Sequence, residues 1–174
     1  MDTVNIVLIG FASCGKSTVA AALCGRSDMR HVDLDRVVEE RYEKRTGARL
    51  TVRRIFGEIG FGGFTALEND ALKSLSGMRG SVLSTGGRTP MDAANRVCLK
   101  SIGGIVYLKC GIGTVIERMK KKGAPLTMGS SPEEIKAEFD KRDPVYAALA
   151  NIVIDNESLT PDEAAEEILS RLSP

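Results

Sequence analysis

The sequence contains no tryptophan, a single histidine, and only 5% aromatic residues. Proteins that bind single-stranded nucleic acid stack bases on aromatic side chains, so this composition does not favour that function. Lysine and arginine number 24 against 23 aspartate and glutamate, which leaves a net charge of +1. Domains that bind polyanions normally carry a clear positive excess. We therefore expect no nucleic-acid partner.

The four cysteines form no Cys-x-x-Cys pair, and the only histidine is His31. This pattern does not fit a zinc site and predicts free thiols in a reducing compartment. No apolar run reaches the 18 or so residues that a membrane span requires. The first predicted strand follows Met1-Asp2-Thr3 directly, without the pattern of a secretory leader. We expect a cytoplasmic monomer that has no membrane partner.

The chain does have a regular alternation of short apolar, β-branched runs with amphipathic helical patterns. This alternation predicts βαβ units, and 174 residues suit one domain. We predict an α/β three-layer sandwich, with an open five-stranded parallel sheet and helices on both faces, formed by residues 1–174. The predicted strands are Val4–Ile9, Arg30–Asp33, Ser81–Ser84, Ile105–Lys109 and Ile152–Ile154. The predicted helices are Lys16–Cys24, Arg36–Lys44, Thr51–Phe56, Phe64–Leu75, Asp92–Leu99, Val115–Lys121, Pro132–Asp140 and Pro161–Leu172.

Two of these helices have explicit start signals. Ser131-Pro132-Glu133-Glu134 and Thr160-Pro161-Asp162-Glu163 each place a hydroxyl at the N-cap, proline at the first helical position and glutamate at the third. Residues 120–131, KKKGAPLTMGSS, are rich in lysine, glycine and serine. This segment is either a solvated connection or a lid over a phosphate site, and we favour the lid.

The sequence GFASCGKST combines glycines with a lysine and two hydroxyl residues between the first predicted strand and helix. Gly10-x-x-x-x-Gly15-Lys16-Ser17 matches the P-loop, whose backbone N–H groups surround the phosphates of a nucleoside triphosphate. In this motif the lysine neutralises the β- and γ-phosphates and the serine hydroxyl binds Mg²⁺. The predicted phosphate contacts are Gly10, Ala12, Ser13, Cys14, Gly15, Lys16, Ser17 and Thr18. Oxidation of Cys14 in this loop could block nucleotide binding.

Two carboxylates follow the second predicted strand in His31-Val32-Asp33-Leu34-Asp35. Side chains two apart on a strand share a face, so Asp33 and Asp35 are expected to point the same way. At the carboxyl edge of a parallel sheet they could hold Mg²⁺ through water or accept a hydroxyl proton. The alternative is that one of them caps the following helix. The spacing alone does not decide between these two roles.

Further motifs make a family recognisable. They are Phe56-x-x-x-Gly60-x-x-x-Phe64-x-x-x-Glu68, Ser84-Thr85-Gly86-Gly87-Arg88, Val106-Tyr107-Leu108, Arg142-Asp143-Pro144-Val145-Tyr146 and the Asp155–Pro161 loop. With the P-loop and the Asp-x-Asp pair, they make the chain resemble the shikimate kinases, P-loop enzymes of the nucleoside-monophosphate-kinase fold, nearly from end to end. The resemblance implies transfer of phosphate from ATP, with Mg²⁺, to a hydroxyl group of a small carboxylated ring, shikimate.

The resemblance also implies roles for single residues. Lys16 and Asp35 would be catalytic, with Asp35 holding the acceptor hydroxyls and helping to deprotonate one. Asp33 would lie near Mg²⁺ with Ser17. The implied acceptor-binding residues are Asp35, Phe56, Phe64, Glu68, Gly86, Gly87, Arg88 and Arg142. Arg142 would pair with the acceptor carboxylate, and Arg118 and Pro161 would flank adenine. The acceptor-binding segment would span residues 34–68 and the lid residues 120–131.

The chain departs from the family pattern at three positions. Thr65 stands where an arginine is expected to bind the acceptor carboxylate, Arg88 replaces the third glycine of a triplet, and Ala124 replaces a lid arginine. Arg88 could substitute for the first arginine or be a surface residue. Lys120, Lys121 or Lys122 could substitute for the second or form a solvated face. Two alternatives therefore stay open: a kinase for another hydroxylated acid, and a catalytically weak nucleotide-binding homologue.

Overall fold

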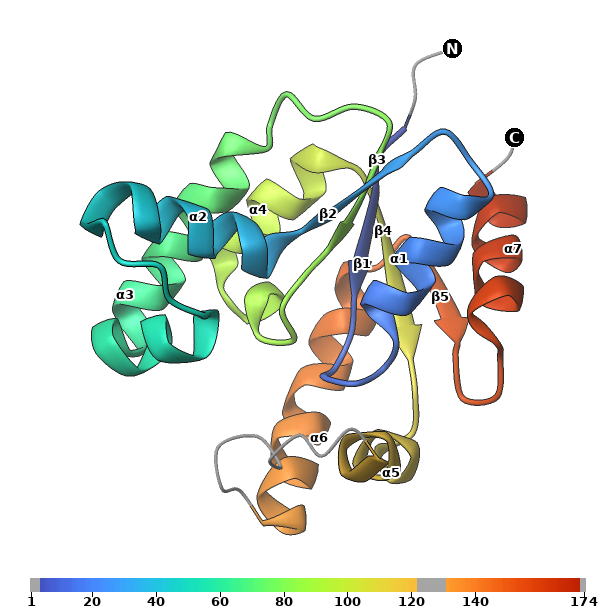
Figure 1. The fold of residues 1–174 in the computed structure, drawn as a ribbon. Helices are drawn as coiled ribbons and strands as arrows, with labels where there is room; N and C mark the ends of the chain where they lie inside the picture. The colour runs from blue at the N-terminus through green and yellow to red at the C-terminus, as the bar shows by residue number, and fades with distance from the viewer. Residues whose placement is uncertain (1–3, 122–130, 173–174) are drawn as a thin grey trace.

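The computed structural model describes residues 4–121 and 131–172. Its centre is an open five-stranded parallel sheet with the strand order β2-β3-β1-β4-β5 (Figure 1). The strands are β1 (Ile6–Ile9), β2 (Arg30–Asp33), β3 (Ser81–Ser84), β4 (Gly104–Lys109) and β5 (Ile152–Asp155). The predicted sheet is thus confirmed. The strand order places the ends of β2, β3 and β1 side by side.

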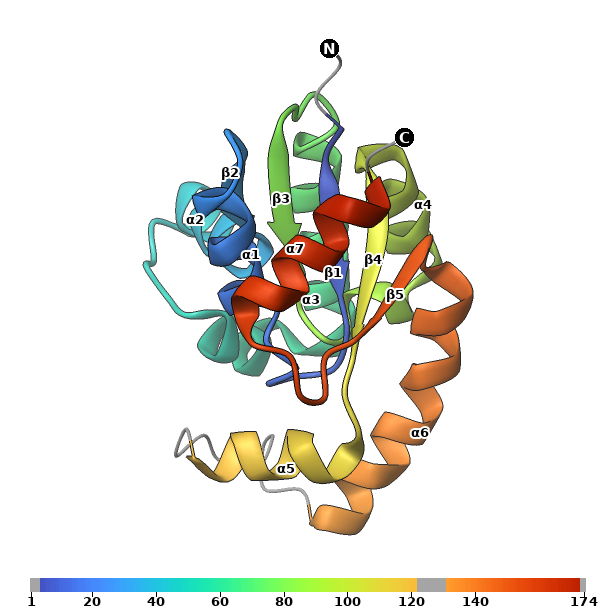
Figure 2. The ribbon, with the colours of Figure 1, turned by 90° about the vertical axis from the view of Figure 1, so that its right-hand side faces the viewer.

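Helices cover both faces of this sheet. Figure 2 shows α1 and α7 in front of the strands, whereas α3 and α4 lie behind them. The helices are α1 (Lys16–Gly25), α2 (Leu34–Thr46), α3 (Val52–Ser74), α4 (Ala93–Ile102), α5 (Ile112–Lys121), α6 (Pro132–Leu149) and α7 (Pro161–Leu172), with a short 3₁₀ helix at Thr89–Met91. Because both faces are covered, all four residues of β1 and of β3 are buried, and β1 is apolar throughout. The three-layer sandwich is confirmed.

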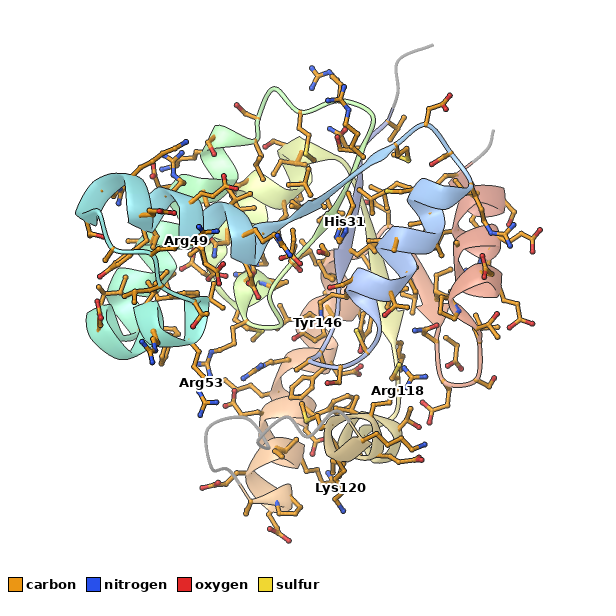
Figure 3. All side chains as sticks on the ribbon, viewed as in Figure 1. His31, Arg49, Arg53, Arg118, Lys120 and Tyr146 are labelled. Carbon is orange, nitrogen blue, oxygen red and sulfur yellow. The ribbon has the colours of Figure 1, made fainter. Side chains whose placement is uncertain are left out.

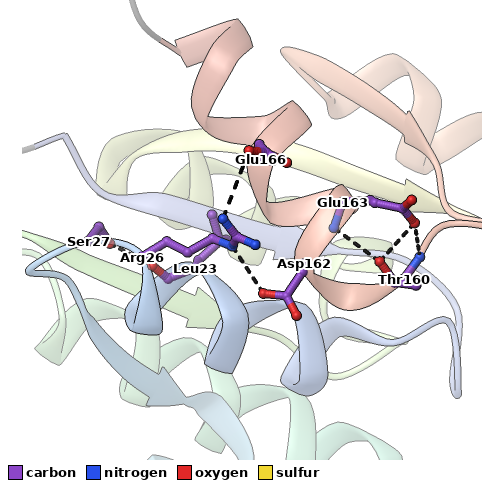
Figure 4. A network of polar contacts seen from close by, with 7 residues as sticks. All are labelled: Leu23, Arg26, Ser27, Thr160, Asp162, Glu163 and Glu166. Atoms are coloured by element: carbon purple, nitrogen blue, oxygen red, sulfur yellow. Dashed lines mark hydrogen bonds and ion pairs between the residues drawn. The ribbon is translucent and has the colours of Figure 1, made fainter.

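The contact between α1 and α7 is strengthened at the protein surface. Arg26, just after α1, donates a hydrogen bond from Nε to Asp162 Oδ1 at 3.0 Å (Figure 4). The first turn of α7 has the expected capping arrangement, in which Glu163 N donates to Thr160 Oγ1 and the Glu163 carboxylate accepts from Thr160 N. Ser131 at the start of α6 forms the same capping box with Glu134. Both predicted helix starts are confirmed.

Several predicted boundaries are wrong. The first strand begins at Ile6 instead of Val4. The predicted helices Thr51–Phe56 and Phe64–Leu75 are two segments of α3 that meet at a kink, where Gly60 has the non-helical φ 66° and ψ −175°. The predicted interruption is confirmed, and only its length is wrong. Glycine adopts a positive φ without steric cost, so the chain bends there and resumes the helix.

The end of α6 also differs from the prediction. The sequence predicts a helix that ends at Asp140, but α6 continues to Leu149 with Pro144 inside it. Proline lowers the stability of a helix interior, but three buried side chains beyond Asp140 fix this part of α6 against the core. They are Arg142, Tyr146 and Leu149. Tertiary packing therefore outweighs the local preference.

Other expectations concern the surface and the thiols. Among the described residues, the helices lack the combination of length and apolarity that crossing a bilayer requires. The four cysteines are free, and Cys14 and Cys110 are buried. Lys120 and Lys121 end α5. The rest of the predicted lid, including Lys122 and Ala124, lies outside the described residues.

Candidate active site

The loop between β1 and α1 has a backbone that only glycine allows at two positions. Gly10 has φ 145°, and a Cβ atom there would lie 2.7 Å from the carbonyl oxygen of Leu108. Gly15 is the N-cap of α1 in the left-handed conformation, with φ 102°. It has no side chain to cap the helix, so the first N–H groups of α1 remain available to a ligand. The positive end of the helix dipole adds to this anion site.

Lys16 lies over the same loop. Its Nζ atom donates hydrogen bonds to the carbonyl oxygens of Gly10 at 2.9 Å and Phe11 at 2.8 Å. The ammonium group is thereby held on the ligand side of the loop, 3.7 Å from Cys14 Sγ. Ser17 follows in the first turn of α1 and is exposed. The loop thus provides a positive charge and a free hydroxyl group beside the helix N-terminus.

A pocket of about 170 Å³ adjoins this loop. Its lining residues are Ser13, Gly15, Thr18, Val19, Arg118, Asn156, Leu159 and Pro161. Arg118 donates to the carbonyl oxygens of Cys14 at 3.4 Å and Asn156 at 3.1 Å, so α5 is joined to the loop between β5 and α7 (Figure 3). The predicted nucleotide residues Arg118 and Pro161 therefore meet in one pocket with the P-loop.

Asn156 was not among the predicted site residues. Its side chain is buried, and Nδ2 donates to the carbonyl oxygen of Cys14 at 2.8 Å. Its Oδ1 atom is buried without a hydrogen-bond partner among the described residues. A buried acceptor left unpaired is costly, and a ligand that donates a hydrogen bond in the pocket would satisfy it. Only the resemblance pointed to this loop, and nothing in the sequence singled out Asn156.

The two carboxylates after β2 lie in different elements. Asp33 ends the strand and caps α2, since its Oδ1 accepts a hydrogen bond from Asp35 N at 3.0 Å. Asp35 lies in the first turn of α2, so the expectation that both side chains share a strand face is wrong. The capping alternative is confirmed for Asp33. Burial, and then the nearby Asp33 charge, raise the pKa of Asp35 to about 6, although Lys16 opposes the shift.

The turn after β3 lies against a second carboxylate. A Cβ atom on Gly86 would lie 3.5 Å from Asp35 Oδ1 and 3.6 Å from Glu68 Oε1, so both carboxylates converge on this glycine. Glu68 is buried, and its Oε1 accepts a hydrogen bond from Thr89 Oγ1 at 2.7 Å. Burial is the main reason why the pKa of Glu68 is raised to about 7. The site therefore contains two carboxyl groups that hold protons more tightly than usual.

Gly87 connects this turn to the P-loop. A Cβ atom there would lie 3.2 Å from the backbone nitrogen of Ala12, so a larger residue would press on the phosphate loop. Thr85 Oγ1 donates to the carbonyl oxygen of Leu8 in β1 at 2.9 Å. From α6, the Tyr146 hydroxyl donates to the carbonyl oxygen of Gly87. The ends of β1 and β3 therefore form one continuous surface.

A second pocket, of about 230 Å³, lies between α3 and the glycine turn. Its lining residues are Phe56, Phe61, Phe64, Thr65, Glu68, Arg88, Met91 and Asp92. Phe56 and Phe64 meet edge to face, with ring centroids 5.6 Å apart. Four of the predicted acceptor residues thus share this pocket, and Phe61 is an addition that the sequence did not indicate. Asp35 and Arg142 do not line it.

Asp35 and Arg142 are joined to this pocket through its lining residues. Asp35 lies next to Glu68, as described above. Arg142 is 8% exposed, and its guanidinium lies 5.1 Å from the centre of the Phe11 ring. It pairs with Glu138 one helical turn earlier, and Arg88 Nη1 lies 3.5 Å from the same oxygen, Glu138 Oε2. The side chains of Arg88 and Arg142 therefore meet at the same carboxylate oxygen.

Glu138 is a further site residue that the sequence reading missed. The (i, i+4) spacing of Glu138 and Arg142 on one helix would have indicated the pair. For a metal, the described residues contain no group of three or more His, Cys, Asp or Glu side chains that could hold an ion. Mg²⁺ commonly binds with one or two protein oxygens together with substrate phosphates. The hydroxyl of Ser17 and the carboxylate of Asp33 fit this pattern.

Comparisons with known proteins agree on one family. The family model described as "Shikimate kinase" matches residues 12–173. A shikimate kinase of Sulfurihydrogenibium sp. is 33% identical over 168 residues, which cover 97% of either chain. That of Aromatoleum aromaticum is 37% identical over 153 residues, covering 86% of this chain and 83% of its relative.

A solved structure gives the same result. Shikimate kinase from Acinetobacter baumannii in complex with shikimate superposes with a TM-score of 0.84 at 31% identity, over 98% of this chain and 93% of the other. The match extends over the P-loop, the glycine turn and the helix that carries Arg142. This chain belongs to the shikimate kinase family.

Proposed function

We propose that this protein is a shikimate kinase, which transfers the γ-phosphoryl group of ATP to a hydroxyl group of shikimate. Its family membership makes it a phosphotransferase with an alcohol acceptor. The observation that carries the proposal for the site is the position of Asp35, whose carboxylate converges with that of Glu68 on Gly86 and feels the charge of Lys16. A general base, a phosphate-binding cation and an acceptor pocket then share the carboxyl edge of the sheet.

The donor would bind at the P-loop. The N–H groups at the start of α1 would donate hydrogen bonds to the phosphate oxygens, and Lys16 would exchange its contacts with Gly10 and Phe11 for phosphate oxygens. Adenine enters the pocket formed by Arg118, Asn156 and Pro161. Mg²⁺, held by Ser17 and through water by Asp33, would neutralise charge on the phosphates.

The acceptor hydroxyl would be activated by Asp35. Its carboxylate accepts the hydroxyl proton while the hydroxyl oxygen forms a bond to the γ-phosphorus, and the bond from that phosphorus to the bridging oxygen of ADP breaks. The raised pKa of Asp35, about 6, lets the group be ionised near neutral pH and still hold a proton transiently.

The acceptor ring would lie against Phe56 and Phe64, with Glu68 and the backbone of Gly86 and Gly87 contacting its hydroxyl groups. Arg142 would bind the carboxylate. Thr65 lines the same pocket and is too short to reach a carboxylate as an arginine does. Arg88 and Arg142 both contact the carboxylate of Glu138. We therefore assign to Arg88 the role of the arginine that Thr65 replaces.

The test is acceptor-dependent ADP release. Purified protein with ATP and Mg²⁺ should form ADP faster when shikimate is added, and ³¹P NMR should show a new phosphate monoester in equal amount. A matched incubation with quinate and simple polyols checks the acceptor. Phosphorylation of another hydroxy acid in place of shikimate would establish a kinase of different specificity. ADP release that no acceptor accelerates would contradict the kinase assignment.

A further inference from the structure

Two arginines from different elements meet one carboxylate beside the acceptor pocket. Arg88, in the turn after β3, and Arg142, in α6, both contact Oε2 of Glu138. Two guanidinium groups and one carboxylate leave a net charge of +1 in this cluster. The cluster can therefore accept one more negative group, or exchange the one that it holds.

The partners differ in exposure. The side chain of Arg142 is 9% exposed, whereas those of Glu138 and Arg88 are 39% and 53% exposed. A buried guanidinium needs an anionic partner, because an unpaired charge is costly to bury. Glu138 is partly exposed, so its carboxylate can supply that partner and would also be solvated if it turned away from the arginines. The attraction of the arginines holds the pKa of the Glu138 carboxyl below its usual range.

The arginines have other contacts that do not involve Glu138. The Arg142 guanidinium lies 5.1 Å from the centre of the Phe11 ring. The Arg88 guanidinium lies 5.2 Å from that of Phe61, which lines the acceptor pocket with Arg88. Cation–π contacts of this kind orient a guanidinium and leave its N–H groups to an anion. Removal of Glu138 therefore leaves both arginines beside the pocket with donors to spare.

We propose that Glu138 is a specificity-determining residue: its carboxylate occupies the anion site formed by Arg88 and Arg142, and the acceptor carboxylate binds by displacing it. The inference rests on the proposed function, because it assumes a carboxylated acceptor in this pocket. It also explains how the site discriminates. A neutral polyol cannot displace Glu138, so only an acid gains the two guanidinium groups.

The proposal predicts opposite effects on charged and neutral ligands. In Glu138→Gln the amide competes more weakly for the arginines, so the Kd of shikimate should fall by about three- to fivefold, the upper part of the range of an exposed ion pair. The Kd of methyl shikimate, which has no free carboxylate, should stay within about twofold of the wild-type value. Calorimetry with each ligand, without ATP, measures both constants.

Two further variants serve as comparisons. Asp140→Asn removes another carboxylate from α6, that of the exposed Lys136–Asp140 pair, and should leave both constants unchanged. Glu138→Asp keeps the charge and shortens the reach by one methylene, so its shikimate Kd should lie between those of wild type and Glu138→Gln. Thermal unfolding of each variant verifies that it is folded.

The outcomes separate this inference from the proposed function. If wild type phosphorylates shikimate while Glu138→Gln binds it equally or more weakly, Glu138 positions Arg142 and the inference alone is wrong. An equal gain for methyl shikimate would also reject it, since the effect would not depend on the carboxylate. If neither wild type nor Glu138→Gln binds shikimate, both the proposed acceptor and the inference are rejected.

Discussion

The hydroxyl group of Tyr146 donates a hydrogen bond to the carbonyl oxygen of Gly87. This contact joins α6, which carries Arg142, to the glycine turn, in which a Cβ atom on Gly87 would lie 3.2 Å from the backbone nitrogen of Ala12 in the P-loop. The phenol is buried, and its ring lies 5.2 Å from that of Tyr107 in β4. Tyr146 thus joins the arginine helix to the acceptor turn, and Thr85 joins that turn to the end of β1 through the carbonyl oxygen of Leu8.

Replacement of Tyr146 by phenylalanine should affect acceptor binding more than nucleotide binding. The change leaves the carbonyl oxygen of Gly87 without its donor and should lower the free energy of unfolding by about 1–3 kcal/mol. The KM for shikimate should rise by more than that for ATP, because the turn and α6 lose this hydrogen bond, although Arg88 and Glu138 still pair. Urea unfolding and the two KM values measure these effects.

A matched control is Tyr42→Phe, which removes a hydroxyl that donates to Glu58 at 2.7 Å; neither residue lines the nucleotide pocket or the acceptor pocket. It should leave both KM values unchanged. If the two tyrosine variants behave alike, the Tyr146 contact does not organise the acceptor site.

Substitution of Lys16 by methionine should lower kcat by about 10²–10³-fold, the usual loss when a preorganised group that stabilises the transition state is removed. Lys16 holds its ammonium group with the carbonyl oxygens of Gly10 and Phe11, and methionine offers neither charge nor donor. Steady-state rates measure the loss. Lys73→Met, at the exposed end of α3, is the control and should keep full activity. A Lys16 variant with more than a tenth of wild-type kcat would contradict the assigned role.

The fold could be predicted because its determinants are local. Apolar β-branched runs such as Ile6–Ile9 indicate buried strands, and Ser131 and Thr160 give explicit helix starts. The errors arose where tertiary packing decides. The glycines of α3 indicated an interruption of the helix, and the error was only in its length, because the kink lies at Gly60 alone. Pro144 in α6 is likewise retained in a helix by the buried residues around it.

The parts of the site that lie within one short sequence motif could be predicted. The P-loop needs its glycines within eight residues, so the sequence alone indicates the phosphate site. Contacts between distant segments were not predictable. Asn156 meets the P-loop across 142 positions, and Phe61 meets Arg88 across the rest of α3 and the whole of β3. Glu138 was missed for a different reason: its partner lies one helical turn away, but the second arginine comes from another element.

The pH dependence of catalysis should follow the protonation of the Asp35 carboxyl group. Since burial raises the pKa of this carboxyl to about 6, it becomes protonated as the pH falls through that value and can no longer accept a proton. The acid limb of kcat/KM for shikimate should therefore have a midpoint near pH 6. Asp35→Asn should lower kcat by about 10²–10⁴-fold, the usual contribution of a general base, and should abolish this limb in the residual activity. An unchanged acid limb in the variant would assign it to another group.

The stability of the protein should depend on pH through Glu68, and Glu68→Gln should reveal it. Burial raises the pKa of this carboxyl from 4.5 to about 7, so the folded state binds its proton more tightly than the unfolded state does. The resulting stability is fully present below about pH 4.5 and is lost as the pH rises through about 7. Glutamine does not titrate, and its carbonyl oxygen can still accept the bond from Thr89.

Urea unfolding at pH 5 and pH 8.5 measures this effect of Glu68. The free energy of unfolding of Glu68→Gln minus that of wild type should be larger at pH 8.5 than at pH 5. The increase should be about 1–3 kcal/mol for a pKa shift of this size. The neighbouring Asp35 titrates in both proteins, so its direct contribution cancels in the comparison. Glu40→Gln, an exposed substitution on α2, should show the same difference from wild type at both pH values. If Glu68→Gln behaves as Glu40→Gln does, the Glu68 carboxylate is ionised in the folded protein at little cost, and its burial does not govern its protonation.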